Sequence, residues 1–266
     1  MQKTITILGC GWLGLPLAVK LTRSGWKVKG STTTPDKLNT LAINNIDPYL
    51  VQLKRLDIAD PVFFDSDVLL INVPPSLRKQ TEQEYLAQMT KLAQAVTASP
   101  VKYVVFISST AVYPELNKMI CDVNEVDSDN ALYRSELLFT QNTAFKTTVI
   151  RLAGLIGPGR HPSRFFAGKQ GIPNGKAPIN LIHLDDCIGI IEQTLIQQKF
   201  GFTWHAAAPT HPQKQEFYTA ATKQADLASP GFMDELKDWK IISSDKITDE
   251  LGYQFIHPDL MAWPGN

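Results

Sequence analysis

The stretch "KTITILGCGWLGLPLAVKLTRSG" (3–25) decides the expected fold. Its first six residues (3–8) predict a buried strand, and residues 13–25 predict an amphipathic helix that ends at Gly25. Between them stands "GCGWLG" (9–14), with the spacing G-x-G-x-x-G. A turn of this kind between a first strand and a first helix is typical of dinucleotide-binding α/β domains.

Each glycine of the turn has its own expected part in binding a dinucleotide. Gly9 allows the tight turn, Gly11 lets the backbone approach a pyrophosphate, and Gly14 lets helix and strand pack closely. The loop continues through Trp12 and Leu13 into the helix, whose first N–H groups supply partial positive charge. The alternative is a glycine-rich turn without a ligand. Its place in a repeated strand–helix pattern favours the binding site.

Strand and helix patterns keep alternating up to Gly157. Further strands are expected over 26–33, 47–57, 66–75, 101–110 and 146–157, and helices over 35–45, 81–99 and 131–144. Alternation at this spacing indicates βαβ units, in which a parallel sheet is covered on both faces. We therefore expect an α/β protein with a Rossmann-type, doubly wound parallel sheet of at least six strands.

The composition changes after Gly157. Residues 158–178 are rich in glycine, proline and cations, so they predict a loop or lid rather than sheet. A strand and a helix are expected over 179–198, another strand over 202–209, and two helices in the C-terminal third. The predicted organisation is a dinucleotide-binding domain, 1–157 completed by about 179–206. A small C-terminal substrate lobe is expected to comprise 158–178 and 207–266.

Composition excludes several other classes of protein. The 266 residues carry a formal net charge of zero, which argues against a nucleic-acid binder, and no apolar run is long enough to span a bilayer. Cys10, Cys121 and Cys187 form neither a zinc spacing nor a disulfide framework, so no metal is expected. The apolar N-terminus resembles a leader peptide, but its three glycines argue against one, and a cytoplasmic location is expected.

The end of the second predicted strand, "GSTTTPDK" (30–37), indicates which dinucleotide is preferred. Its hydroxyls and its cation belong to Ser31, Thr32, Thr33 and Lys37, and no carboxylate precedes Asp36. A carboxylate here would bind the ribose 2′-hydroxyl of NAD, so its absence favours NADP and leaves NAD open. A solvated turn is the alternative. Two further segments are expected to line the dinucleotide. Asp57 and Ile58, which end the third predicted strand, are expected at the adenine. The residues that end the fourth predicted strand are expected at the pyrophosphate and ribose: Asn72, Val73 and Pro74.

Four segments in a fixed order carry a resemblance to a known family. They are "GCGWLG" (9–14), "FISSTAVYP" (106–114), "IRLAGLIGPGR" (150–160) and "NLIHLDD" (180–186). With them the chain resembles the extended short-chain dehydrogenases/reductases, the nucleotide-sugar epimerase and dehydratase superfamily. More narrowly, it is similar to the YeeZ-like group of atypical bacterial members. The resemblance covers most of the chain and implies the fold and the cofactor more strongly than the activity.

The resemblance also assigns roles to single residues. Ser109 matches the residue that hydrogen-bonds the reacting oxygen of the substrate, and Tyr133 matches the catalytic tyrosine. The loop "GLIGPG" (154–159) matches the segment that closes over the nicotinamide end of the cofactor. His183 and Asp185 match positions that more often brace the structure than act in the reaction.

One departure from the family pattern lies in "ALYRSELL" (131–138). In the family, a lysine four residues after the tyrosine favours the phenolate through its positive charge. Here that position is Leu137, and the residue before it is Glu136, which would oppose the anion if it faced inward. Tyr133 could still donate a proton while neutral, so reduction of a carbonyl would be affected less than oxidation of an alcohol.

Two functions follow from these residues. The first is an NADP(H)-dependent oxidoreductase or epimerase with an incomplete Tyr–Lys pair, acting on a small anionic or nucleotide-linked substrate. The cations Arg160, His161, Arg164 and Lys169 would bind the anionic group, unless they are a solvated lid. The second is a non-catalytic dinucleotide-binding sensor, which the missing lysine favours. Oligomeric state stays open, a homodimer included.

Overall fold

The structure is a computed structural model that describes residues 3–58, 60–75 and 80–262, without the side chains of 56–58. The chain forms two compact units, each made of several segments. The first unit comprises 1–109, 127–150 and 194–203, and the second comprises 110–126, 151–193 and 204–266. The predicted lobes, 1–157 with 179–206 and 158–178 with 207–266, stay a prediction.

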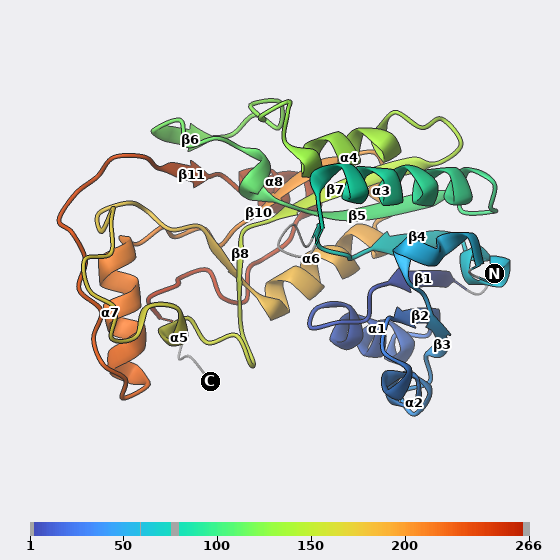
Figure 1. The fold of residues 1–266 in the computed structure, drawn as a ribbon, viewed down its shortest axis with the longest axis horizontal. Coiled ribbons are helices and arrows are strands. Elements are labelled where there is room, and N and C mark those ends of the chain that lie inside the picture. The colour runs from blue at the N-terminus through green and yellow to red at the C-terminus, as the bar shows by residue number, and fades with distance from the viewer. Residues whose placement is uncertain (1–2, 59, 76–79, 263–266) are drawn as a thin grey trace. The chain divides into compact units, whose positions relative to one another are not determined.

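The central feature is a seven-stranded sheet (Figure 1). Its strands are β1 (Thr4–Leu8), β2 (Lys27–Thr32), β3 (Asp47–Leu50), β4 (Val68–Ile71), β5 (Tyr103–Ser109), β7 (Lys146–Leu152) and β10 (Thr203–Ala206). They lie in the order β10-β7-β5-β4-β1-β2-β3, and the pairs β1–β2, β1–β4, β2–β3 and β4–β5 are parallel. The predicted Rossmann-type sheet is confirmed.

The central strands are largely buried because helices cover both faces of the sheet. All four residues of β4 are buried, as expected for a central strand of a parallel sheet. The covering helices of the first unit are α1 (Gly14–Arg23), α2 (Leu38–Ala42), α3 (Glu82–Thr97) and α4 (Ala131–Thr140). From β1 the chain proceeds to β2 and β3, and from β4 it proceeds the other way to β5 and β7. Right-handed crossovers therefore place α1 and α2 on one face and α3 and α4 on the other (Figure 1).

Local sequence explains where α3 and α4 begin. At α3 the side chain of Thr81 accepts from the N–H of Glu84, and the Glu84 carboxylate accepts from the N–H of Thr81, which is a capping box. At α4 the side chain of Asn130 accepts from the N–H groups of Leu132 and Tyr133. The second cap fixes the start of the helix that carries Tyr133.

Two predicted strands differ from the observed ones. The third is shorter than 47–57, because β3 ends at Leu50 and the chain enters the 3₁₀ segment η2 (Leu53–Ile58). Asp57 and Ile58 therefore do not end a strand, and their side chains lie outside the described residues. The sixth is split: β7 ends at Leu152, and β8 (Gly154–Ile156) pairs in parallel with β9 (Leu181–His183).

The second unit is built from short elements. They are β6 (Lys118–Ile120), β8, β9, β11 (Lys240–Ile242), α5 (Ser163–Phe166), α6 (Leu184–Ile196), α7 (Lys214–Gln224) and α8 (Asp245–Leu251). β6 and β11 form a two-stranded parallel sheet, and neither strand was expected from the sequence. The apolar core of the second unit includes Ile156, Leu181, Phe217 and Leu260.

No helix among the described residues combines the length and the apolar composition that crossing a membrane requires.

Candidate functional site: a dinucleotide loop and a tyrosine helix

The glycine loop has the geometry expected of a phosphate-binding turn. Gly9 has φ +105°, and a Cβ there would lie 2.4 Å from the carbonyl oxygen of Asn72. A Cβ at Gly14 would lie 2.2 Å from the carbonyl oxygen of Gly9. At Gly11, by contrast, no heavy atom of the described residues lies within 4 Å of that position. Gly9 and Gly14 are therefore needed for packing, and Gly11 leaves open space beside the backbone.

Neighbouring strands hold the loop in place. The Oγ of Ser31, in β2, accepts from the N–H of Gly9 at 3.0 Å, and Nδ2 of Asn72, after β4, donates to the carbonyl of Gly9 at 3.0 Å. The N–H of Cys10 donates to the carbonyl of Ser31 at 2.8 Å. Here the chain order along the sheet reverses between β1 and β4, which is where doubly wound sheets bind ligands.

A cavity of about 440 Å³ adjoins the loop within the first unit. Six of the predicted cofactor residues line it: Gly9, Ser31, Thr32, Thr33, Val73 and Pro74. Sequence reasoning missed Lys54, the cation among the described lining residues, together with Gln52, Gln80 and Gln88. The described side chains that line the cavity include no carboxylate. The cavity therefore offers hydroxyl groups, amide groups and one cation beside the glycine loop.

The other described residues of the predicted cofactor set do not line this cavity. Lys37 is exposed at the end of the 3₁₀ segment η1 (Pro35–Lys37). Trp12 is half-buried, and Leu13 is buried in the core at the start of α1. Asn72 braces Gly9, as described above. Lys54 reaches the cavity because η2 returns the chain past the end of β2, which no local pattern indicates.

Ser109 and Tyr133 belong to the same unit and to elements that touch. Ser109 is the last residue of β5, and Tyr133 lies in the first turn of α4, which packs against β5. Both side chains are half-buried, and so is Leu137. The predicted pair therefore lies at the carboxyl edge of the sheet, the edge that also carries the glycine loop.

Glu136 does face inward. It is 1% exposed, and Ser108, beside Ser109, donates a hydrogen bond to its carboxylate. On the same helix Ser135 is hydrogen-bonded to the phenol of Tyr85 at 3.1 Å. Burial raises the pKa of Tyr85 to about 12, and the charge of Glu136 adds to this effect. The buried carboxylate of Glu136 thus lies one turn from Tyr133. It precedes Leu137, the position that matches the lysine of the family.

The predicted anion-binding cations share one segment of the second unit. Arg160 and Arg164 are exposed. His161 accepts from the N–H of Ser163 at 3.2 Å and is hydrogen-bonded to its Oγ at 2.6 Å, which braces the start of α5. Lys169 donates to the carbonyl of Phe165 at 2.8 Å. The exposed arginines remain the candidates for binding an anion.

His183 and Asp185 contact the C-terminal segment of their own unit. Asp185 lies 3.2 Å from His257, and the rings of His183 and His257 have centroids 3.9 Å apart. Burial lowers the pKa of His183, and the neighbouring His257 lowers it further. The fully buried Asp186 accepts from the N–H of Ile256 at 2.6 Å and the hydroxyl of Tyr253 at 2.9 Å. Sequence reasoning missed His257, which is 74 positions from His183.

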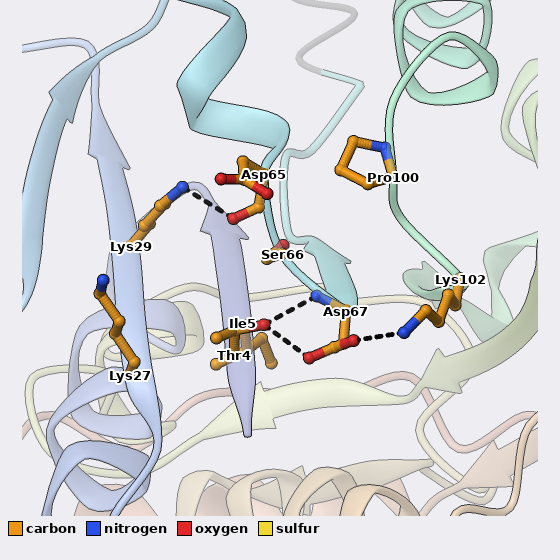
Figure 2. Close-up of a pocket in the computed structure, with 9 residues that line it drawn as sticks. All are labelled: Thr4, Ile5, Lys27, Lys29, Asp65, Ser66, Asp67, Pro100 and Lys102. Atoms are coloured by element: carbon orange, nitrogen blue, oxygen red, sulfur yellow. Dashed lines mark hydrogen bonds and ion pairs between the residues drawn. The ribbon is translucent and has the colours of Figure 1, made fainter. Parts of the chain in front are cut away.

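A second cavity of the first unit, of about 280 Å³, lies at the opposite edge of the sheet (Figure 2). Thr4 begins β1 there, and Asp67 precedes β4. Asp67 pairs with Lys102 at 2.8 Å and accepts from Thr4 at 2.7 Å, and the buried Lys29 donates to the carbonyl of Asp65 at 2.8 Å. Because these groups are bound to one another and ligands occupy the carboxyl ends of such sheets, the glycine-loop edge is the better candidate for the functional site.

The fold and the glycine loop define the class of protein: a Rossmann-type α/β protein with a glycine-rich turn between its first strand and its first helix. The chain belongs to the YeeZ family. It is 34% identical over 273 residues to Protein YeeZ of Escherichia coli (strain K12), a match that covers 99% of each chain. No model of a known protein family matches it.

Solved structures share the fold at lower identity. A putative NAD-dependent epimerase/dehydratase from Methylobacillus flagellatus has a TM-score of 0.77 and 23% identity, covering 97% of this chain and 95% of its own. Human epimerase family protein SDR39U1 with NADPH has a TM-score of 0.73 and 15% identity, covering 97% of each chain. MoeE5 in complex with UDP-glucose and NAD has a TM-score of 0.76 and 15% identity, covering 95% and 93%.

Proposed function

We propose that the protein binds NADP(H) at the carboxyl edge of the first unit and uses it as an oxidoreductase or epimerase. The observation that carries the proposal is the open space at Gly11, at the point where the strand order reverses. There the backbone N–H groups at the start of α1 would hold a pyrophosphate. The cavity lined by Thr32, Thr33 and Lys54 would hold the adenosine ribose and its phosphate. The neighbours with NADPH or NAD support a nicotinamide dinucleotide.

Preference for NADP over NAD rests on Lys54 in this proposal. Lys54→Gln is expected to weaken NADPH binding about 10-fold and to leave NADH binding within about twofold, since a charge-assisted hydrogen bond contributes about 1.5–3 kcal/mol. Fluorescence titration of both nucleotides measures this. Lys91→Gln, which changes an exposed lysine of α3 outside the cavity lining, is the matched control. Equal weakening of NADPH binding and NADH binding would show that Lys54 does not contact the 2′-phosphate.

The proposed chemistry uses Ser109 to orient a substrate oxygen and Tyr133 to exchange a proton with it. A bound nicotinamide would supply or accept the hydride. Leu137 supplies no ammonium to favour a phenolate at Tyr133, at the position where the family has a lysine. A neutral phenol donates a proton, so the proposed favoured direction is reduction of a carbonyl.

The substrate in this proposal is small and anionic, or linked to a nucleotide. Its support is the pair of exposed arginines, Arg160 and Arg164, in a segment rich in glycine and proline. Guanidinium groups bind phosphate and carboxylate in a bidentate way. The neighbour that binds UDP-glucose agrees with this class of substrate.

Replacing both arginines tests the substrate class. Arg160→Ala with Arg164→Ala is expected to raise KM for an anionic substrate at least about 10-fold, because each charge-assisted contact contributes about 1.5–3 kcal/mol. NADPH affinity should stay the same. Lys223→Ala, which changes a cation of α7 in the same unit, is the control. Parallel loss of NADPH affinity would assign the arginines to the cofactor.

A second candidate is a dinucleotide-binding sensor without catalysis. Leu137 favours it, because the residue that supports the phenolate in the family is missing. The two candidates differ in one measurement, the consumption of NADPH with a panel of aldehydes, ketones and nucleotide sugars. Tight NADPH binding without consumption of NADPH on any of them would favour the sensor.

A further inference from the structure

Three side chains that commonly bind metals converge in the second unit. His183 ends β9, Asp185 lies in the first turn of α6, and His257 comes from the segment after α8. Their candidate ligand atoms all lie within 4.8 Å of one another. His183 is 4% exposed, so the group is anchored in the protein interior on one side. Asp185 is half exposed, which gives an ion a path from solvent.

The separations between these atoms suit a bound ion better than an ion pair. Oδ2 of Asp185 lies 3.3 Å from Nδ1 of His183 and 3.2 Å from Nε2 of His257. Charge-assisted N–H···O hydrogen bonds are shorter, about 2.7–2.9 Å. In a tetrahedral zinc site with bonds of about 2.0–2.1 Å, adjacent ligand atoms lie about 3.3–3.4 Å apart. The two observed separations fit the edges of such a tetrahedron.

The hydrogen bonding of His183 also favours a cation. The N–H of Asp185 donates to Nδ1 of His183 at 3.2 Å, so this nitrogen presents its lone pair. The carboxylate oxygen of Asp185 faces the same nitrogen. Two electron-rich atoms in contact repel each other, and a cation between them removes the repulsion. The ion would replace one long hydrogen bond.

The surrounding structure holds His257 in position. The N–H of His257 donates to Oδ2 of Asp186 at 3.1 Å, while Oδ1 of Asp186 binds the N–H of Ile256 and the hydroxyl of Tyr253. Asp186 is fully buried and adjoins the ligand Asp185. Outer contacts of this kind orient the residues that bind a metal.

We propose that His183, Asp185 and His257 form a binding site for a divalent transition metal, with Zn²⁺ as the ion it fits. Two imidazoles and one carboxylate suit zinc, whereas magnesium and calcium prefer oxygen ligands throughout. Three protein ligands leave the fourth position for water. The ion would join the C-terminal segment to the start of α6, so its expected role is to stabilise the second unit.

The test measures zinc binding by the full-length protein. The protein is stripped with chelator, carries Cys121→Ser to remove the exposed thiol, and is titrated with ZnCl₂ by calorimetry. One Zn²⁺ is expected to bind per chain and to raise the unfolding temperature. Co²⁺ in place of Zn²⁺ should give the visible absorption of a tetrahedral site.

Variants locate the binding site. His257→Ala and Asp185→Asn are each expected to weaken zinc binding by at least about 10–100-fold, because losing a residue that only orients a metal ligand already has an effect of that size. Each variant should also lose the zinc-dependent rise in unfolding temperature. The half-exposed position of Asp185 lets its variant fold should His257→Ala fail to. His211→Ala, which changes a histidine bonded to Ile179, is the matched control and should bind zinc unchanged. Absence of zinc binding, or equal affinity in all variants, would overturn the proposal.

Discussion

Gly11→Leu is expected to abolish binding of NADPH while the protein stays folded. A side chain at this position enters the open space beside the start of α1, where the pyrophosphate is proposed to lie. We expect the affinity to fall by more than about 100-fold, which corresponds to about 2.8 kcal/mol. Fluorescence titration with NADPH and thermal unfolding of the same samples measure both effects.

Gly14→Ala supplies the contrast. The added methyl group would lie 2.2 Å from the carbonyl oxygen of Gly9, so this variant is expected to lose stability, as overpacked sites typically do, by about 1–3 kcal/mol or more. The two substitutions should thus have different effects: the one at Gly11 on NADPH binding and the one at Gly14 on stability. Unchanged NADPH binding by Gly11→Leu would show that the pyrophosphate does not bind at this loop.

Tyr133→Phe is expected to lower turnover by about 10²–10⁴-fold, the usual contribution of a positioned acid or base. NADPH affinity should stay the same, because the change removes one hydroxyl group from α4 and leaves the glycine loop as it is. Consumption of NADPH with the most active substrate of the panel is the measurement. If turnover survives the loss of the hydroxyl, the tyrosine is structural and another acid must be sought.

Leu137→Lys tests the proposed effect of the missing ammonium on proton exchange by Tyr133. An ammonium one turn from Tyr133 favours the phenolate, so any oxidation of an alcohol should move to lower pH. Some stability should be lost as well, since burying an ammonium has a cost. Leu138→Lys places the same charge one position further along α4 and is the matched control. An identical shift in both variants would indicate a general charge effect.

The sheet could be predicted because its elements carry local patterns. The buried run of β4, the capping box of Thr81 and the three glycines each specify one element within a few residues. β6 and β11 escaped prediction because each is three residues long and forms only by pairing with the other, 122 positions away between Lys118 and Lys240. Pairing over that distance leaves no local pattern.

The candidate site was predictable to the same degree. Residues next to a strand end, such as Gly9, Ser31 and Val73, could be assigned from the sequence, and they line one cavity. Lys54 could not be assigned, because a strand was predicted over 47–57. In the structure η2 replaces the end of that strand and brings Lys54 to the cavity. The split after Leu152 was missed too: the absence of a side chain at Gly154 allows close approach to Leu181, where a Cβ would lie 2.6 Å from Cδ2.

The strand order has a consequence during synthesis on the ribosome. β7 pairs with β5 on one side and with β10 on the other, yet β10 begins at Thr203, long after β7 ends at Leu152. Translation of these roughly 50 residues takes about 3–10 s at 5–20 residues per second. For that time the nascent sheet has an open, apolar edge at β7, the kind of edge that pairs with other chains. We therefore expect the nascent chain to bind chaperones most strongly in this interval, and release to follow the emergence of β10.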